Sequence, residues 1–166
     1  MRVEIQPDKR VMNSYGINKS IFQLTYRSRA AEGLTTSQIM EIVDEAVAFN
    51  KKHDITGCLV FDQGFFIQLL EGEKEIVEEL YTKIKKDQRH FQFEILSKGW
   101  TSERQFQSWD MGYISMEEYD LGEKAELVSK ARNALDTIST KNDFTPKVFW
   151  YNIYTLLTAS KFYKNL

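Results

Sequence analysis

The chain has 166 residues, of which 42% are hydrophobic and 28% charged, and its formal net charge is -2. This composition is that of an ordinary globular protein, and it gives no basic surplus for nucleic acid or an anionic membrane. The single cysteine excludes an intramolecular disulfide, and no apolar run approaches the roughly 18–20 residues of a membrane span. We therefore expect a cytoplasmic protein that binds neither nucleic acid nor membrane.

The first predicted strand follows an irregular lead-in. Residues 1–20 show no period and are interpreted as an amino-terminal arm. Residues 21–28 alternate, which places Phe22, Leu24 and Tyr26 on one face of a strand.

A helix is predicted after this strand. Thr35 precedes Gln38 with the spacing of a capping box, which indicates a helix start. The apolar positions step by three and four, and they are Ile39, Ile42, Val43, Ala46 and Val47. Because the same step continues onto Asn50, we expect the helix to turn a primary amide toward the core.

A hairpin is predicted next, with strands at 57–62 and 64–72 around the turn Gln63–Gly64. Gln68 lies in the middle of the second strand, on the same face as Phe66 and Leu70. A buried primary amide costs about 1–3 kcal/mol for each group without a hydrogen-bond partner. A polar partner must therefore lie opposite Gln68.

The next predicted elements are an amphipathic helix over 73–86 and a strand over 91–100. Trp109 and Met111 then alternate with Tyr113 along a fifth strand that ends near residue 115. The order strand, helix, strand, strand, helix, strand, strand predicts an α+β fold, a ferredoxin-like sandwich with an extra strand.

Two helices are predicted after this core. We interpret 21–119 as the core domain and 120–166 as a carboxy-terminal helical extension, with helices over 122–138 and from Thr145 onward. Thr145 and the proline after it are a typical cap and first-turn residue. The last helix is apolar on most of its circumference, so we expect it to dock on the open face of the sheet and to mediate self-association.

Three polar residues stand out in the predicted core: Tyr26, Asn50 and Gln68. Because the first strand of this topology is central, Tyr26 and Gln68 are expected to face each other, flanked by Trp109 and Met111. The alternative interpretation is structural: Tyr26 and Gln68 satisfy one another, and Asn50 caps its helix.

Other polar residues suggest no chemistry of their own. His53 and His90 are expected at the surface, and no metal site is predicted. Glu71 and Glu73 are interpreted as flanking a turn, because paired-carboxylate catalysis has no other support.

The chain resembles a known family at six places that occur in order. They are Leu-Thr-Tyr-Arg-Ser at 24–28, Asn50, Asp-Ile-Thr-Gly at 54–57, Phe-Phe-Ile-Gln-Leu-Leu-Glu-Gly at 65–72, Asp-Gln-Arg-His at 87–90 and Phe-Gln-Ser-Trp-Asp-Met at 106–111. Together they are similar to a BLUF domain, a sensor of blue light that uses flavin, over roughly residues 20–118.

The resemblance implies a photoactive set of residues. Tyr26 matches the family's photoactive tyrosine, and Gln68 matches the glutamine between that tyrosine and the flavin ring. Trp109 and Met111 match the pair whose environment changes on illumination, and Ser28 matches a hydroxyl near the tyrosine.

The resemblance also implies a flavin site. Asn50 would hold the pyrimidine edge of the ring, Ile42 and Ile84 would form its walls, and Asp87 and Arg89 would lie near the ribityl or phosphate end. The full set of residues expected to contact the cofactor is Tyr26, Ile42, Phe49, Asn50, Gln68, Ile84, Asp87 and Arg89. The cofactor would be FAD, with FMN as the alternative.

The function implied is that of a short, stand-alone blue-light photoreceptor and not an enzyme. Light would move an electron and a proton from Tyr26, rearrange Gln68 and bias the carboxy-terminal helices. The signal would then pass by protein–protein contact to a partner that the sequence does not name, and the chain would form a homo-oligomer. The alternatives are a small flavin-dependent oxidoreductase and a flavin-binding regulatory module.

Overall fold

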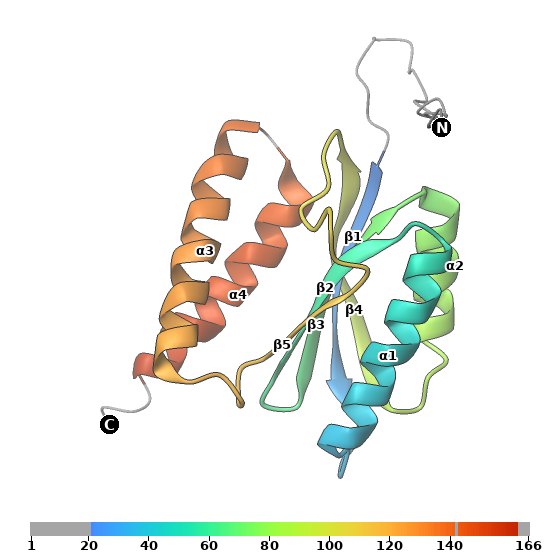
Figure 1. The fold of residues 1–166 in the computed structure, drawn as a ribbon, viewed down its shortest axis with the longest axis horizontal. Coiled ribbons are helices and arrows are strands. Elements are labelled where there is room, and N and C mark those ends of the chain that lie inside the picture. Colours follow the sequence, from blue (N-terminus) through green and yellow to red (C-terminus); the bar gives the residue numbers. More distant parts are fainter. Residues whose placement is uncertain (1–20, 142, 163–166) are drawn as a thin grey trace, which may run out of the picture.

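The computed structural model describes residues 21–141 and 143–162, so the expected amino-terminal arm lies outside the described residues. The elements in chain order are β1 (Ile21–Ala30), α1 (Thr36–Lys52), β2 (Thr56–Asp62), β3 (Phe65–Gly72), α2 (Lys74–Ile84), β4 (His90–Thr101), β5 (Gly112–Ser115), α3 (Leu121–Lys141) and α4 (Phe144–Phe162). This is the predicted order, and Figure 1 shows its arrangement.

Local signals explain two of these element boundaries. The Thr35 side chain accepts a hydrogen bond from the Gln38 backbone N–H, and the Gln38 side chain accepts one from the Thr35 backbone N–H, so the capping box is confirmed. Between β2 and β3, Gln63 and Gly64 have φ values of 45° and 79°. A two-residue turn with positive φ at both positions matches the twist of an antiparallel hairpin, which is the predicted connection.

The sheet has the strand order β4-β1-β3-β2-β5. β1 pairs antiparallel with both β3 and β4, so it lies in the centre, whereas β5 adds parallel to β2 at one edge. The first four strands have the ferredoxin-like arrangement and β5 is the extra strand, which confirms the predicted α+β fold.

Each face of the sheet is covered by a pair of helices (Figure 1). One core lies under α1 and α2, and its buried residues include Leu24, Tyr26, Phe66, Leu70 and Val77. The other core lies under α3 and α4, and its buried residues include Ile67, Leu69, Phe149, Trp150 and Ile153. The alternation of β3 sends Phe66 and Leu70 to the first core and Ile67 and Leu69 to the second, as predicted.

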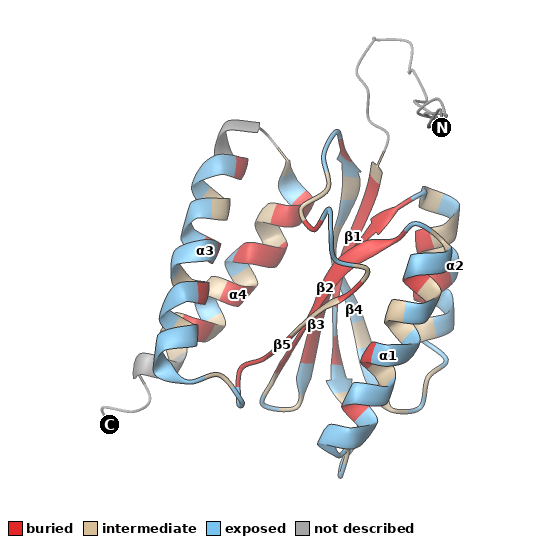
Figure 2. Ribbon diagram, in the orientation of Figure 1, coloured by how far each residue is buried: buried red, intermediate tan, exposed pale blue. Residues whose placement is uncertain are grey.

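The last helix covers the open face of the sheet, as expected, and it contacts β1, β3 and β4. Figure 2 shows that its sheet-facing side is buried while its other side is partly exposed. The helix begins at Phe144, one residue before the predicted cap, and the Thr145 hydroxyl instead lies 2.9 Å from the Ser97 hydroxyl of β4. Within the described chain, no helix combines the length and apolarity needed to cross a membrane.

Candidate functional site

A cleft of about 280 Å³ opens between α1, α2 and the face of the sheet that they cover. All eight residues that were expected to contact a cofactor line it: Tyr26, Ile42, Phe49, Asn50, Gln68, Ile84, Asp87 and Arg89. Ile42 and Ile84 project from the two helices and provide apolar walls, and the polar groups come from the sheet and the helix ends. This is the usual composition of a ligand pocket, a largely apolar cavity with a few placed polar groups.

Tyr26 and Gln68 form the polar floor of the cleft. They face each other in the register of β1 and β3, and the Tyr26 hydroxyl donates a short hydrogen bond to Gln68 Oε1. Gln68 Nε2 donates to Met111 Sδ at 3.3 Å. Burial raises the pKa of the Tyr26 hydroxyl well above its ordinary value, so the phenol keeps its proton at neutral pH.

Asn50 lies at the end of α1 with its side chain fully buried. Its Nδ2 donates to the backbone oxygen of Asp110 at 2.6 Å, so the side chain bridges to the segment before β5 and does not cap its own helix. Its Oδ1 is buried but has no hydrogen-bond partner, and among the described residues no other buried side-chain oxygen or nitrogen lacks one. An unpaired buried carbonyl costs about 1–3 kcal/mol, so this atom requires a donor from outside the chain.

Trp109 does not flank Tyr26 and Gln68, contrary to our expectation. The backbone turns at residues 107–108, so β5 begins only at Gly112 and the predicted alternation from residue 109 is wrong. The indole stacks on Phe106 at 5.4 Å between ring centroids, with Lys130 Nζ of α3 4.9 Å from its centre. It is 37% exposed, whereas Met111 is buried against Gln68 as predicted.

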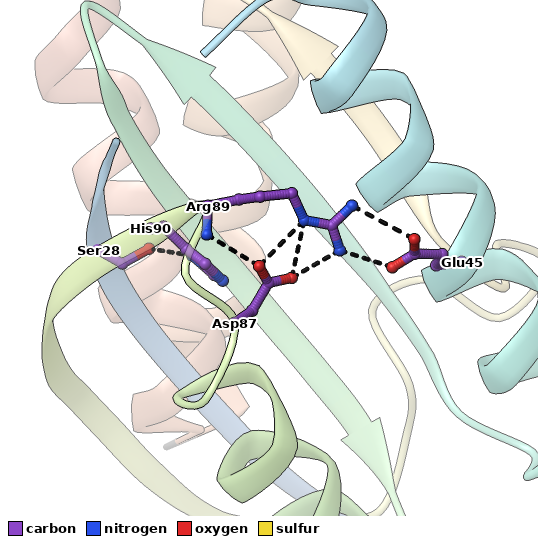
Figure 3. A network of polar contacts seen from close by, with 5 residues as sticks. All are labelled: Ser28, Glu45, Asp87, Arg89 and His90. Atoms are coloured by element: carbon purple, nitrogen blue, oxygen red, sulfur yellow. Dashed lines mark hydrogen bonds and ion pairs between the residues drawn. The ribbon is translucent and has the colours of Figure 1, made fainter. Parts of the chain in front are cut away.

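Charged residues of both signs close the mouth of the cleft. Arg89 forms ion pairs with Asp87 and with Glu45 of α1, each at 2.6 Å (Figure 3). The hydrogen bonds from Arg89 hold the pKa of the Asp87 carboxyl below its usual value. The guanidinium therefore ties the loop after α2 to α1 across the cleft.

His90 is buried, which corrects the expected surface position. It begins β4 and lines the cleft, and its Nδ1 lies 2.8 Å from the Ser28 hydroxyl (Figure 3). The rings of Phe66 and Phe93 meet the imidazole edge-on, at 5.5 and 4.6 Å between centroids. Desolvation by this burial lowers the pKa of His90. Ser28 does not line the cleft itself but contacts His90, which does.

Glu71 is a polar residue whose surroundings the sequence analysis missed. It precedes the connection from β3 to α2, as interpreted, but it is fully buried on the other face of β3. The signal was available, because alternation puts Glu71 on the apolar face of Ile67 and Leu69, and the argument applied to Gln68 applies equally there. Among the described residues, no group of three His, Cys, Asp or Glu is placed to hold a metal ion.

A family model described as "BLUF: Sensors of blue-light using FAD" matches residues 21–112. The chain is 43% identical over 70 residues to the photoactivated adenylate cyclase subunit alpha-like protein FB of Euglena gracilis, covering 42% of this chain and 7% of the relative. It is 36% identical over 98 residues to the blue light- and temperature-regulated antirepressor BluF of Escherichia coli, covering 59% and 23%. The chain therefore spans less than a quarter of either relative.

The solved structure of BlsA in its photo-activated state has the same fold. Its TM-score is 0.58 at 32% sequence identity, and the match covers 66% of this chain and 77% of that one. The family match spans more than half of the chain and includes the strands and helices that form the cleft. The chain belongs to the BLUF family of flavin-based blue-light sensors.

Proposed function

We propose that Asn50, Gln68 and Tyr26 hold the ring of a non-covalently bound, oxidised flavin in the cleft, and that Tyr26 and Gln68 carry out its photochemistry. The observation that carries this proposal is the unpaired Oδ1 of Asn50. This buried acceptor belongs to a residue of the same cleft that Tyr26 and Gln68 line. The pyrimidine edge of a flavin presents N3–H between two carbonyl groups. An amide side chain matches such an edge because it offers one acceptor and one donor group.

The size of the cleft supports a ring and not a whole dinucleotide. Its volume of about 280 Å³ is at the lower end of ordinary ligand pockets, which span roughly 300–1,000 Å³. The ring body would lie between Ile42 and Ile84, with Phe49 beside it. The rest of the cofactor would leave past the mouth, where Asp87 and Arg89 lie.

The cofactor proposed is FAD, as the family description states, with FMN as the alternative. Arg89 is already paired with Glu45 and Asp87. A guanidinium whose donors are satisfied by carboxylates gives little extra attraction to a phosphate. The affinity therefore depends on the ring and not on the tail.

The bound flavin would supply the absorption of blue light and the electron acceptor. Tyr26 would give up an electron and then a proton through Gln68, because burial disfavours a charge that stays on its ring. The short hydrogen bond to Gln68 Oε1 supplies the path for that proton. The electron and the proton would then return to Tyr26, and Gln68 would be left with its amide rotated, tautomerised or both.

Met111 would transmit a change in the orientation of the Gln68 amide to the rest of the chain. In the arrangement described, Gln68 Nε2 donates to the sulfur of Met111. A thioether accepts weakly and donates nothing, so a rotated amide would place an oxygen against a sulfur that has no proton to give. Met111 must then move, and with it the start of β5.

The output proposed is a protein–protein signal without catalysis, in the cytoplasm. Residues 21–119 would form the sensor domain, and 120–166 would carry the signal and contact a second copy of the chain. Support for self-association comes from Phe144 and Tyr151 of α4, which are 68% and 62% exposed. Large exposed aromatic side chains are typical of interaction surfaces.

Replacement of Tyr26 by Phe tests the proposal, with Tyr81→Phe as the matched control. Tyr81 is a second buried tyrosine, with ring centroids 5.1 Å from Tyr26. The purified chain should be yellow, and its absorption should shift to the red under blue light and recover in darkness. Tyr26→Phe should keep the colour and abolish the shift, while Tyr81→Phe should keep both.

A shift that survives in Tyr26→Phe would overturn the assignment of that residue. Bleaching of the protein by a reduced nicotinamide cofactor in darkness would favour a flavin-dependent oxidoreductase instead.

A further inference from the structure

Glu71 occupies the centre of the sheet on the face opposite the cleft. It lies three residues after Gln68 on β3 and is completely buried. In the register of the sheet it is paired with Gln23 of β1 on one side and with Thr56 of β2 on the other. A buried carboxyl group is rarely tolerated unless its oxygens are fully hydrogen-bonded.

The carboxyl group of Glu71 accepts four hydrogen bonds. Two come from its neighbours in the sheet, Gln23 Nε2 at 2.8 Å and the Thr56 hydroxyl at 3.3 Å. Two come from backbone N–H groups, that of Gln105 at 2.7 Å and that of Phe106 at 2.9 Å. Both backbone donors belong to the segment 102–111, which joins β4 to β5 without regular secondary structure.

The other end of this segment contacts two residues of the cleft. The backbone oxygen of Asp110 accepts from Asn50, and Met111 Sδ accepts from Gln68. Between the two ends, the Trp109 N–H donates to the Phe106 oxygen at 3.2 Å. The segment is thus held on one face of the sheet by Glu71 and on the other by the two amides of the cleft. The side chain of Arg104 adds hydrogen bonds to the Thr56 hydroxyl and to the backbone oxygens of Glu71 and Asp54.

We propose that Glu71 is a positioning residue for the light-sensing site. By fixing Gln105 and Phe106 it sets where Asp110 and Met111 meet Asn50 and Gln68. Only four residues separate Phe106 from Met111, and the hydrogen bond from the Trp109 N–H to the Phe106 oxygen keeps this stretch of chain compact. A displacement of Phe106 should therefore also displace Met111.

The same carboxyl group connects the cleft to the last helix. Phe106 packs against Phe149 and Trp150 of α4, at 5.8 and 5.7 Å between ring centroids. Movement of Met111 that loosens the segment would therefore reach α4 through Phe106. This consequence for signalling rests on the proposed function, whereas the positioning role does not.

The test variant is Glu71→Gln, which keeps the size of the side chain. A carboxylate offers acceptors on both oxygens, whereas an amide presents an NH2 group in place of one of them. One pair of donors would then face another donor. Ile153→Val of α4 is the control, because it removes one methylene from the core that Phe106 shares and leaves the hydrogen bonds of the segment in place.

The measurement is made in darkness on the full chain, by NMR of 13C-methyl methionine and by amide hydrogen exchange. The chain has five methionines, and Met111→Leu assigns the relevant signal. Glu71→Gln should shift the Met111 signal and speed exchange at the Phe106 amide by about tenfold or more, as loss of one hydrogen bond predicts. Ile153→Val should change neither, even where its melting temperature falls equally.

An unmoved Met111 signal in folded Glu71→Gln, or an equal change in the control, would overturn the proposal. If Glu71→Gln fails to fold, hydrogen exchange in the unaltered chain decides the question. The Gly57 N–H of β2 donates to the Trp109 oxygen at 3.2 Å, so it reports on the same segment. The amides of Phe106, Trp109 and Gly57 should then open in one shared event, and separate opening would overturn the proposal. Neither readout requires a photoshift, so failure of the photosensor assignment would be seen separately, in the light-induced spectrum.

Discussion

The two faces of β3 hold buried polar groups under opposite conditions. On the face toward α1 and α2, Gln68 and Tyr26 border a cleft in which Asn50 Oδ1 has no partner among the described residues. On the face toward α3 and α4, Glu71 accepts four hydrogen bonds from the chain itself. Complete satisfaction identifies a structural network, whereas an unpaired buried atom beside a cavity indicates a place for a ligand.

Truncation of the two cores should give the largest difference between the faces. Ile153 is fully buried between α4 and the sheet, and Ile153→Ala should lower the free energy of unfolding by about 2–5 kcal/mol. Ile84 borders the cleft and is only partly buried, so Ile84→Ala should cost less than about 1.5 kcal/mol without flavin. Urea denaturation of both variants measures this, and equal losses would contradict the comparison.

The second prediction compares the removal of one buried amide side chain on each face of the sheet. Asn50→Ala should weaken flavin binding by about 10- to 100-fold, because the ring loses its partner. In the flavin-free chain the stability should change by less than about 1 kcal/mol, because the lost hydrogen bond to Asp110 is offset by removal of the unpaired buried Oδ1. Gln23→Ala, which removes a donor from Glu71, should do the reverse: about 1–3 kcal/mol less stability and unchanged flavin affinity. Flavin fluorescence titration and urea denaturation provide the two readouts.

The third prediction concerns the indole that lies outside the cleft. A Cβ atom at Gly112 would come within 2.1 Å of the Trp109 ring, so Gly112→Ala should drive the indole off Phe106 into solvent. The lost stacking is worth about 0.5–1.5 kcal/mol. The tryptophan emission of Gly112→Ala should move to the red relative to the unaltered chain, and subtracting the emission of a Trp109→Phe variant isolates the signal of Trp109. An unchanged spectrum would show that the indole stays in place.

The smallest effect expected is a change of pH dependence at the rim of the cleft. Because burial lowers the pKa of His90 below its ordinary value of 6.5, the unfolded state binds a proton more readily than the folded state. Its contribution to stability is therefore complete above pH 6.5 and is lost as the pH falls below that value. His90→Gln should flatten this acid-side decline in urea midpoints, and His53→Gln is the control; parallel curves would contradict the prediction.

Much of the fold followed from local patterns. The alternation of apolar residues predicted β1 and β3, and the predicted topology placed Tyr26 opposite Gln68. The helical period of 3.6 predicted that Asn50 faces the core at the end of α1. The periods place Tyr26, Asn50 and Gln68 toward the cleft, but the set of eight was implied by the resemblance, because Asp87 and Arg89 lie in the loop between α2 and β4, where no period applies. The topology then determines which faces meet.

The sequence could not predict features that depend on irregular backbone. Trp109 was expected to follow the alternation of β5, but no local pattern announces the turn at 107–108 that sends it toward α3. His90 was expected outside because a lone histidine after a charged loop carries no period. The burial of Glu71 could have been predicted from the alternation of β3, but its partners at 105 and 106 could not, because they are backbone groups that leave no trace in residue type.

The pairing of β1 with β3 and β4 also determines when the sensing site can exist. Tyr26 is aligned with Gln68 on one side and with Ile95 on the other, so its surroundings join segments far apart in the chain. Long-range pairings of this kind slow folding, because the entropy of closing a large loop is lost before the contacts that stabilise it can form. During synthesis on the ribosome, the cleft can therefore assemble only after β4 has emerged, which makes cofactor loading a late event in the life of the new chain.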